Sequence, residues 1–191
     1  MKIAFTGRRP KNLVGYNESS YTQFSEQLEQ ILATYGDDTE FICGGAQGFD
    51  QLAAKAALNL KLRFPNIKIH LYLPFEGQEK RWLKQGFFGQ DMYNFQKRNA
   101  DTIRYISDIE ETAPYSEIVK ALFLRDEAMV NDADIVIALY PTDDWQTAKG
   151  GTSHTMQYAF DKKPLYQIKY NTNQNKLSIE GEMVLLNPNL S

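Results

Sequence analysis

The chain has 191 residues, of which 42% are hydrophobic and 24% are charged, so it can bury a full core and is not expected to be disordered. Its net charge of −3 argues against broad binding to a nucleic-acid backbone, which needs a basic face. Cys43 is the single cysteine, which excludes an internal disulfide, and no run approaches the roughly 20 apolar residues of a membrane-spanning helix. We therefore expect a cytoplasmic protein that does not insert into membranes.

Short apolar runs alternate with amphipathic segments in the first part of the chain. Strands are predicted over Lys2–Thr6, Glu40–Cys43 and Ile67–Leu73, the last from its strict alternation of apolar and polar side chains. Between the first two strands, apolar residues recur at helical spacing. An alanine-rich segment after Cys43 predicts a second helix that packs closely on the sheet.

The stretch Phe75–Asp101 differs in composition from the segments around it. It is rich in charges and aromatic side chains, and its glycines interrupt any helix. We interpret residues 75–115 as a lid insertion that contains one or two short helices. Phe75 and Trp82 could stack on the base of a bound nucleotide, and packing beneath the lid is the alternative for both.

Strands and helices continue to alternate after this insertion. Strands are predicted over Thr102–Ile106, Ile135–Tyr140 and Pro164–Ile168, with helices between them. Because Ile135–Tyr140 is the most apolar run of the chain, we expect it to be a central, buried strand. The remaining residues, 171–191, form a C-terminal extension at the sheet edge, with a hairpin that turns at Glu180-Gly181.

The alternation of strands and helices predicts the fold class. It indicates an α/β protein with a Rossmann-like, open and mostly parallel sheet that carries helices on both faces. The sequence contains no internal repeat, low-complexity segment or linker. We therefore expect a single domain that covers residues 1–191.

Three segments share the order strand, glycine-rich turn, helix: Thr6-Gly7-Arg8, Gly44–Gly48 and Gly150–Ser153. Parallel strands bring their C-terminal ends to one edge of a sheet, so these turns are expected to converge. Glycine lets the backbone approach an anion closely, and a helix N-terminus presents free N–H groups to it. Each turn alone fits a plain connector, but the three together predict a phosphate or nucleotide site. The sequence has neither a P-loop motif nor a strict G-x-G-x-x-G, which disfavours P-loop NTPases and standard dinucleotide dehydrogenases.

The expected ligand contacts come from these turns and from one helical arginine. The predicted ligand- and phosphate-binding residues are Thr6, Gly7, Arg8, Arg9, Gly44, Gly45, Ala46, Gly48, Asp50, Arg125, Gly150, Gly151, Thr152 and Ser153.

Two carboxylates are candidates for a catalytic role, Asp50 and Glu79. Asp50 opens the helix after the second turn, where it would either cap the helix or meet a ribose hydroxyl. Glu79 lies past the third strand, where a solvated charged loop is the alternative. Arg125 would either clamp a ligand anion or form a structural salt bridge. Two histidines and one cysteine give no metal-ligand spacing, so we expect neither a metal nor a cofactor.

At its glycine turns the chain resembles the SLOG superfamily, named for the Smf/DprA and LOG proteins, and more closely the YpsA-like proteins. The resemblance rests on Thr6–Pro10, Gly44–Asp50, Arg125–Val130 and Gly150-Gly151-Thr152 and extends to about residue 170. It implies a Rossmann-like fold that binds nucleotides or nucleotide-derived molecules. Some members are enzymes, and others are DNA-processing or ligand-sensing modules.

LOG-type phosphoribohydrolases carry a motif that reads roughly Pro-Gly-Gly-x-Gly-Thr, followed by a glutamate three residues later. The related run here is Lys149–Thr155, in which the second glycine pair is absent and Thr155 stands in the place of the glutamate. This departure argues against hydrolysis of the LOG type.

The sequence therefore predicts a protein that senses or sequesters a nucleotide-derived small ligand at the C-terminal edge of its sheet. The alternative is a nucleoside or nucleotide N-glycosidase or transferase. A module that handles single-stranded DNA, as in the DprA branch, is disfavoured by the acidic charge balance. An exposed aromatic face would allow a homo-oligomer.

Overall fold

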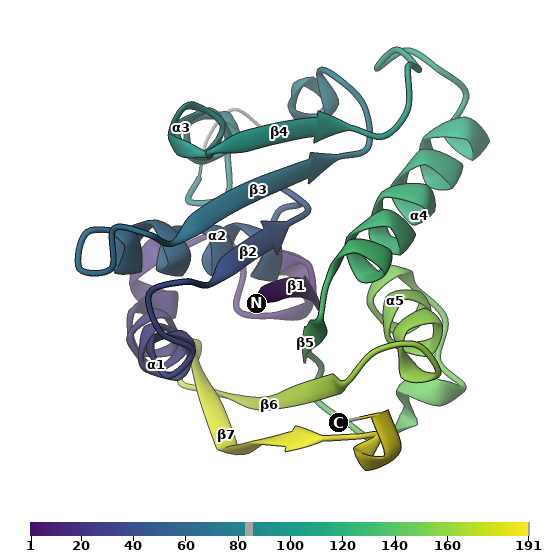
Figure 1. Cartoon of the computed structure of the whole chain (residues 1–191). Helices are drawn as coiled ribbons and strands as arrows, with labels where there is room; N and C mark the ends of the chain where they lie inside the picture. The colour runs from purple at the N-terminus through teal and green to yellow at the C-terminus, as the bar shows by residue number, and fades with distance from the viewer. Residues whose placement is uncertain (83–85, 191) are drawn as a thin grey trace.

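The computed structural model describes residues 1–82 and 86–190 and has a seven-stranded sheet as its centre (Figure 1). The strands lie in the order β4-β3-β2-β1-β5-β6-β7. Their bounds are β1 Lys2–Gly7, β2 Glu40–Cys43, β3 Lys68–Leu73, β4 Thr102–Tyr105, β5 Ile135–Leu139, β6 Leu165–Asn173 and β7 Lys176–Leu185. All neighbouring strands are parallel except β6 and β7, which are antiparallel. The predicted Rossmann-like α/β fold is confirmed.

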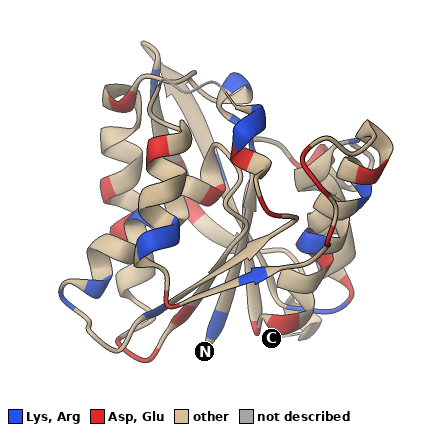
Figure 2. Cartoon of the chain, turned by 90° about the horizontal axis from the view of Figure 1, so that it is seen from above, with Lys and Arg blue, Asp and Glu red and all other residues tan. Residues whose placement is uncertain are grey.

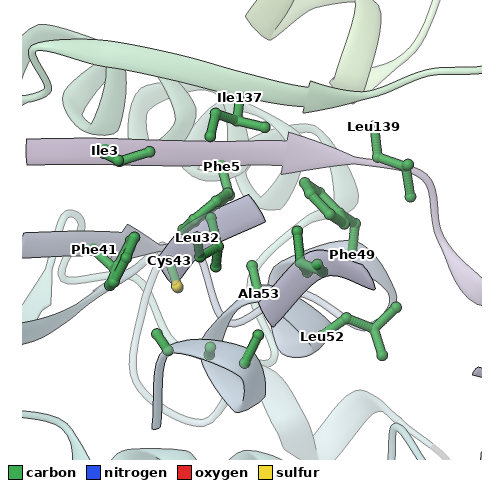
Figure 3. Packing of buried hydrophobic residues seen from close by; sticks show 14 of the residues in the cluster. Ile3, Phe5, Leu32, Phe41, Cys43, Phe49, Leu52, Ala53, Ile137 and Leu139 are labelled. Atoms are coloured by element: carbon green, nitrogen blue, oxygen red, sulfur yellow. The ribbon is translucent and has the colours of Figure 1, made fainter. Parts of the chain in front are cut away.

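Helices cover both faces of this sheet because the side chains of each interior strand alternate between two cores. On one face, Ile3, Phe5 and Cys43 pack against α1 (Thr22–Ala33) and α2 (Phe49–Lys61), as Figure 3 shows. On the other face, Ala4, Ile42 and Val136 pack against α4 (Tyr115–Asp132) and α5 (Gly151–Phe160). The remaining helix, α3 (Gln90–Asn99), contributes Tyr93 to the first core.

The order in which the chain adds strands to the sheet reverses at the boundary between β1 and β5. From β1 it proceeds outward through β2, β3 and β4, and then it returns to the other side of β1 with β5. In open α/β sheets, ligands bind at such a switch point, outside the carboxyl ends of the strands. The strand β5 is an interior, buried strand, as its apolar run predicts, although the middle position belongs to β1.

The hairpin at the C-terminal end turns at a different place from the predicted one. The turn between β6 and β7 is made by Gln174 and Asn175, which both have positive φ, 49° and 58°. Glu180 and Gly181 lie inside β7, next to an irregularity in its pairing with β6. The prediction of a turn at Glu180-Gly181 was therefore wrong, because Gly181 lies at an irregularity inside a strand and not in the turn between two strands. Ser191, the last residue of the predicted extension, lies outside the described residues.

The stretch expected to form a lid contains a short 3-10 helix, Gln78–Arg81, and α3. Phe88 and Tyr93 from this stretch are fully buried in the core on the α2 side. Of the described residues in 75–115, Tyr115 alone lines the cavity at the sheet edge. Residues 83–85 of the expected lid lie outside the described residues, and the lid role stays a prediction.

Candidate functional site

A cavity of about 330 Å³ lies where the loops after β1, β2 and β5 meet the first half of α4. The first glycine turn contributes Thr6, Gly7, Arg8 and Arg9, and the second contributes Ala46 and Asp50. The third contributes Gly150, Gly151 and Thr152, and Arg125 joins from α4. The three turns thus converge at the switch point of the sheet, which is the expected geometry of their parallel strands.

Four of the predicted ligand-binding residues lie near the cavity without lining it. Gly44 and Gly45 pack beneath it, Gly44 against the Arg125 guanidinium and Gly45 against Leu73. Gly48 is the N-cap of α2, with φ of 100°. The Ser153 hydroxyl donates to the Gly150 carbonyl, 3.1 Å away, and so serves the start of α5.

The catalytic candidate Glu79 lies elsewhere. It lines a separate hollow with Glu76, Lys80 and Glu111, and that hollow shares no residue with the cavity at the switch point. Asp50 and Glu79 are therefore not brought together, and they cannot form an acid–base pair in one site.

The first two turns are locked to each other by a close backbone contact. The Phe49 N–H donates to the Arg8 carbonyl at 3.2 Å. A Cβ on Gly48 would overlap that carbonyl, and its positive φ is strained for any other residue. Glycine at this position therefore allows the N-terminus of α2 to sit directly against the loop after β1.

A buried charge cluster forms the floor of the cavity. Arg125 is 3% exposed and donates from Nη1 to the Gly44 carbonyl. The same Nη1 lies 3.4 Å from Asp50 Oδ2, and Nε lies 2.8 Å from Asp126 Oδ1 in an ion pair that lacks hydrogen-bond alignment. Two carboxylates thus face one guanidinium, so Arg125 is compensated within the protein. This arrangement matches the structural salt bridge that the sequence left open for Arg125.

Burial is the largest influence on the pKa values of Asp50 and Arg9 at this floor. It raises the pKa of Asp50 from 3.8 to about 6, against the opposing influence of the Arg125 charge. Burial also lowers the pKa of Arg9, while the nearby Asp50 carboxylate opposes that change. A carboxyl that lines a cavity and exchanges its proton at about pH 6 is suited to acid–base chemistry.

Arg8 differs from Arg125 in its partners. Its guanidinium carbon lies 4.4 Å from the centre of the Tyr140 ring, and its side chain also interacts with the Tyr170 hydroxyl. Its buried Nε has no hydrogen-bond partner among the described residues. Within residues 1–82 and 86–190, Arg8 forms no ion pair with a carboxylate. Arg8 lines the cavity, and a guanidinium that stacks on an aromatic ring retains its capacity to bind an anion.

The N-terminus of α5 faces the same cavity through Gly150, Gly151 and Thr152. Gly150 is the N-cap, with φ of 135°, and the first turn holds no acidic side chain. The first N–H groups of a helix have no acceptor within it, and the helix dipole places partial positive charge there. Lys149, exposed beside this turn, adds a further positive charge.

Sequence reasoning missed one wall of the cavity. It is formed by α4, from which Tyr115, Val119, Leu122, Phe123 and Asp126 line the cavity. Their spacing of four, three, one and three residues is that of a single helix face, which is the signal that could have identified them.

The two aromatic residues proposed for base stacking lie elsewhere. Phe75 is 1% exposed and packs with Ile118 and Ala121, and the Trp82 ring is 5.1 Å from that of Tyr93. Neither lines the cavity. Both therefore follow the packing alternative.

Cys43 and His154 are held by contacts with other side chains of the protein. Cys43 is fully buried in the first core. His154 packs on Phe123 with ring centres 4.3 Å apart and lies 3.4 Å from Glu127. In the part of the chain that the structure describes, no three His, Cys, Asp or Glu side chains are placed to hold a metal ion, and no helix is long and apolar enough to cross a membrane.

A family model named YpsA, and described as the YspA SLOG family, matches residues 3–174. The chain belongs to this SLOG family. The match spans all three glycine turns and α4, so the cavity lies wholly within the segment that defines the family.

Relatives of this SLOG protein occur in Bacillus. The SPbeta prophage-derived protein YoqJ of Bacillus subtilis (strain 168) is 29% identical over 140 residues, which cover 69% of this chain and 75% of YoqJ. A UPF0398 protein of Bacillus velezensis is 23% identical over 177 residues, which cover 87% of this chain and 90% of that protein.

Among solved structures, the SLOG chain is similar to DNA processing protein A (DprA) from Streptococcus pneumoniae. The TM-score is 0.57 at 14% sequence identity, over 91% of this chain and 52% of DprA. The chain thus spans about half of the DprA chain, and at this identity the likeness concerns the fold alone.

Proposed function

We propose that this protein binds a nucleotide or a nucleotide-derived small molecule in the cavity at the switch point, and thereby senses or sequesters it. The ligand's anionic group would lie between the Arg8 guanidinium and the N-terminus of α5. The convergence of these two groups carries the proposal, because a guanidinium that pairs with no carboxylate of the described residues and a helix N-terminus both favour an anion. A cavity of about 330 Å³ suits a small ligand and is too small for a protein segment.

The charge cluster on the floor supports a sugar near Asp50 and not a phosphate. Asp50 and Asp126 both lie beside Arg125, and Arg9 lies near Asp50, so the two guanidinium groups at the deep end of the cavity already have carboxylate partners within the protein. A phosphate there would face like charges, whereas a ribose hydroxyl would donate a hydrogen bond to a carboxylate. The polarity of the cavity therefore favours a phosphate at α5 and a sugar at Asp50.

Mass spectrometry of the molecules that co-purify, followed by thermal shifts against a panel of nucleoside mono-, di- and triphosphates, tests the proposal. A ligand present at about 100 times its Kd stabilises a protein by roughly 2.7 kcal/mol. The decisive variant is Thr152→Asp, which adds a negative charge in the first turn of α5. That charge favours the helix dipole by about 0.3–1 kcal/mol, so the free protein should keep or raise its Tm. Its repulsion of the ligand anion should abolish the nucleotide-induced shift.

Thr152→Ser is the matched control, because it retains the hydroxyl and adds no charge. It should keep the nucleotide-induced shift of the wild type. If no nucleotide raises the Tm of the wild type, or if Thr152→Asp responds as the wild type does, the proposal is wrong.

A second candidate function is cleavage or transfer at an N-glycosidic bond, and the buried Asp50 carboxyl favours it. This group lines the cavity, and its pKa is raised to about 6. Purified protein incubated with nucleoside monophosphates should then release free base, and Asp50→Asn should abolish the release while ligand binding persists. Absence of base release from the wild type would leave ligand binding as the function.

A further inference from the structure

The cavity has a second wall with a chemistry unlike that of its anion-binding side. Four apolar residues of α4 line it: Tyr115, Val119, Leu122 and Phe123. They follow one face of the helix over about 12 Å, at a rise of about 1.5 Å per residue. The same face continues to Asp126 at the floor. The wall is therefore apolar at the mouth of the cavity and carries a charged side chain at its deep end.

This apolar wall is supported from behind. Leu122 packs against a small core of Phe75, Ile118 and Ala121, which fixes the first half of α4 beside the cavity. Tyr115 stands at the mouth with 75% of its surface exposed. Covering apolar side chains that line a cavity and remain accessible to water stabilises a complex, because their apolar surface is removed from water.

The wall is also joined directly to the anion-binding end. The Phe123 ring packs on the His154 ring, and the backbone N–H of His154 donates to the Gly150 carbonyl in the first turn of α5. A ligand with its anion at Gly151 and Thr152 would therefore extend along Phe123 toward Tyr115. Gly7, Arg8 and Asn12, which also line the cavity, are polar or lack a side chain, so the α4 wall is where such a ligand finds apolar partners.

We infer that the α4 wall of Tyr115, Val119, Leu122 and Phe123 receives a planar ring of the ligand, so that the site selects anions that carry a ring over the same anion without one. This inference rests on the proposed function and assigns the residues that determine its specificity. A planar ring packs well on aromatic and branched side chains, and such contacts contribute about 0.5–1.5 kcal/mol beyond the area they bury. Phosphate or a sugar phosphate would occupy the α5 end and leave the wall in water.

Calorimetric titration tests the inference with two kinds of probe: the nucleoside monophosphates AMP, GMP, CMP and UMP, and ribose 5-phosphate, which carries the same sugar and phosphate without a base. The wild type should bind at least one nucleotide more tightly than ribose 5-phosphate. Tyr115→Ala and Val119→Thr should each weaken nucleotide binding roughly 3- to 10-fold and leave the affinity for ribose 5-phosphate unchanged. Val119→Thr keeps the shape of the side chain, and Tyr115 is exposed, so both variants should fold.

Leu124→Ala is the control on the same helix, because Leu124 is 42% exposed and does not line the cavity. It should bind both probes as the wild type does. The inference is overturned if ribose 5-phosphate binds as tightly as every nucleotide, or if the α4 variants change both probes alike or neither. If neither kind of probe binds to the wild type and no nucleotide raises its Tm, the proposed function itself fails and the assignment of the wall fails with it. Loss of binding of both probes in Thr152→Asp would support the proposed function. Weaker binding of the nucleotide alone in Tyr115→Ala would support the inference.

Discussion

At the scale of single residues, the floor of the cavity depends on the space that Gly44 leaves open. A Cβ on Gly44 would overlap the Arg125 guanidinium and lie 2.5 Å from Asp50 Oδ2. The arginine is thus able to reach the Gly44 carbonyl and both carboxylates because this position has no side chain. For Gly151, at the start of α5, no other part of the described chain lies within 4 Å of the place where a Cβ would stand.

The same substitution at these two glycines should have opposite effects on stability. We predict that Gly44→Ala lowers the free energy of unfolding by about 3 kcal/mol or more, because it displaces a buried guanidinium from its partners. Gly151→Ala should leave it unchanged or raise it by up to about 1 kcal/mol, since alanine favours helix. Denaturant unfolding of both variants measures this, and equal effects would contradict the assigned role of Gly44.

The pH dependence of stability should report on Asp50. Its pKa in the folded protein is raised from 3.8 to about 6, so between these values the folded protein holds a proton that the unfolded chain has released. The stabilising contribution of Asp50 is therefore complete below about pH 4 and is lost as the pH rises through about 6. Relative to Asp50→Asn, the wild type should lose on the order of 2–3 kcal/mol between pH 4 and pH 7. Thermal unfolding of both proteins across this range measures the difference, and a constant difference would show that Asp50 titrates normally.

At the scale of the elements, the bounds of a strand could be predicted where the local sequence pattern is strong. Glu40–Cys43 was placed with its observed bounds, because a short apolar run between a polar segment and a glycine turn has few alternatives. The turn at Gln174-Asn175 was missed, because neither residue is a glycine or proline and the nearby Gly181 gave the stronger turn signal. Both residues adopt the left-handed conformation that a type I′ hairpin requires.

The hairpin should therefore gain stability from better turn residues. We predict that the double substitution Gln174→Asn and Asn175→Gly raises the free energy of unfolding by roughly 0.5–1 kcal/mol, because asparagine and glycine tolerate positive φ at lower cost. Gly181→Ala serves as the contrasting variant: its φ is 68°, so it should destabilise the protein even though its Cβ would meet open space. Equal stability of all three proteins would contradict this assignment of the turn.

The candidate site could be predicted in part. The convergence of Arg8, Asp50 and Gly151 follows from the rule that parallel strands present their C-terminal ends at one edge. The spacing of the α4 residues marks one helix face in the sequence, but that this face lines the cavity could not be predicted, because the orientation of α4 depends on how Phe75 and Ile118 pack behind it, and these residues are far apart in the sequence. For the same reason, the sequence could not decide whether Arg125 faces the ligand or the two aspartates.

At the scale of the whole molecule, the order of the strands and the distribution of charge both favour the proposed small ligand. The three glycine turns meet where the strand order reverses, beside β1 and β5. Figure 2 shows basic and acidic segments interspersed over the helices, in line with a net charge of −3. A phosphate backbone is attracted by a continuous basic face, whereas one nucleotide needs only a local site.

The most direct measurement is calorimetric titration of the nucleotide that gives the largest thermal shift, with the wild type and two arginine variants. Arg8→Gln removes the Arg8 guanidinium, and we predict a loss of affinity of about 10-fold or more, as expected when a charge-assisted hydrogen bond is lost. Arg98→Gln makes the same charge change on α3, at an exposed residue that does not line the cavity, and should bind as the wild type does. Equal affinities of the wild type and Arg8→Gln would contradict the central claim that the ligand's anion lies between Arg8 and the N-terminus of α5.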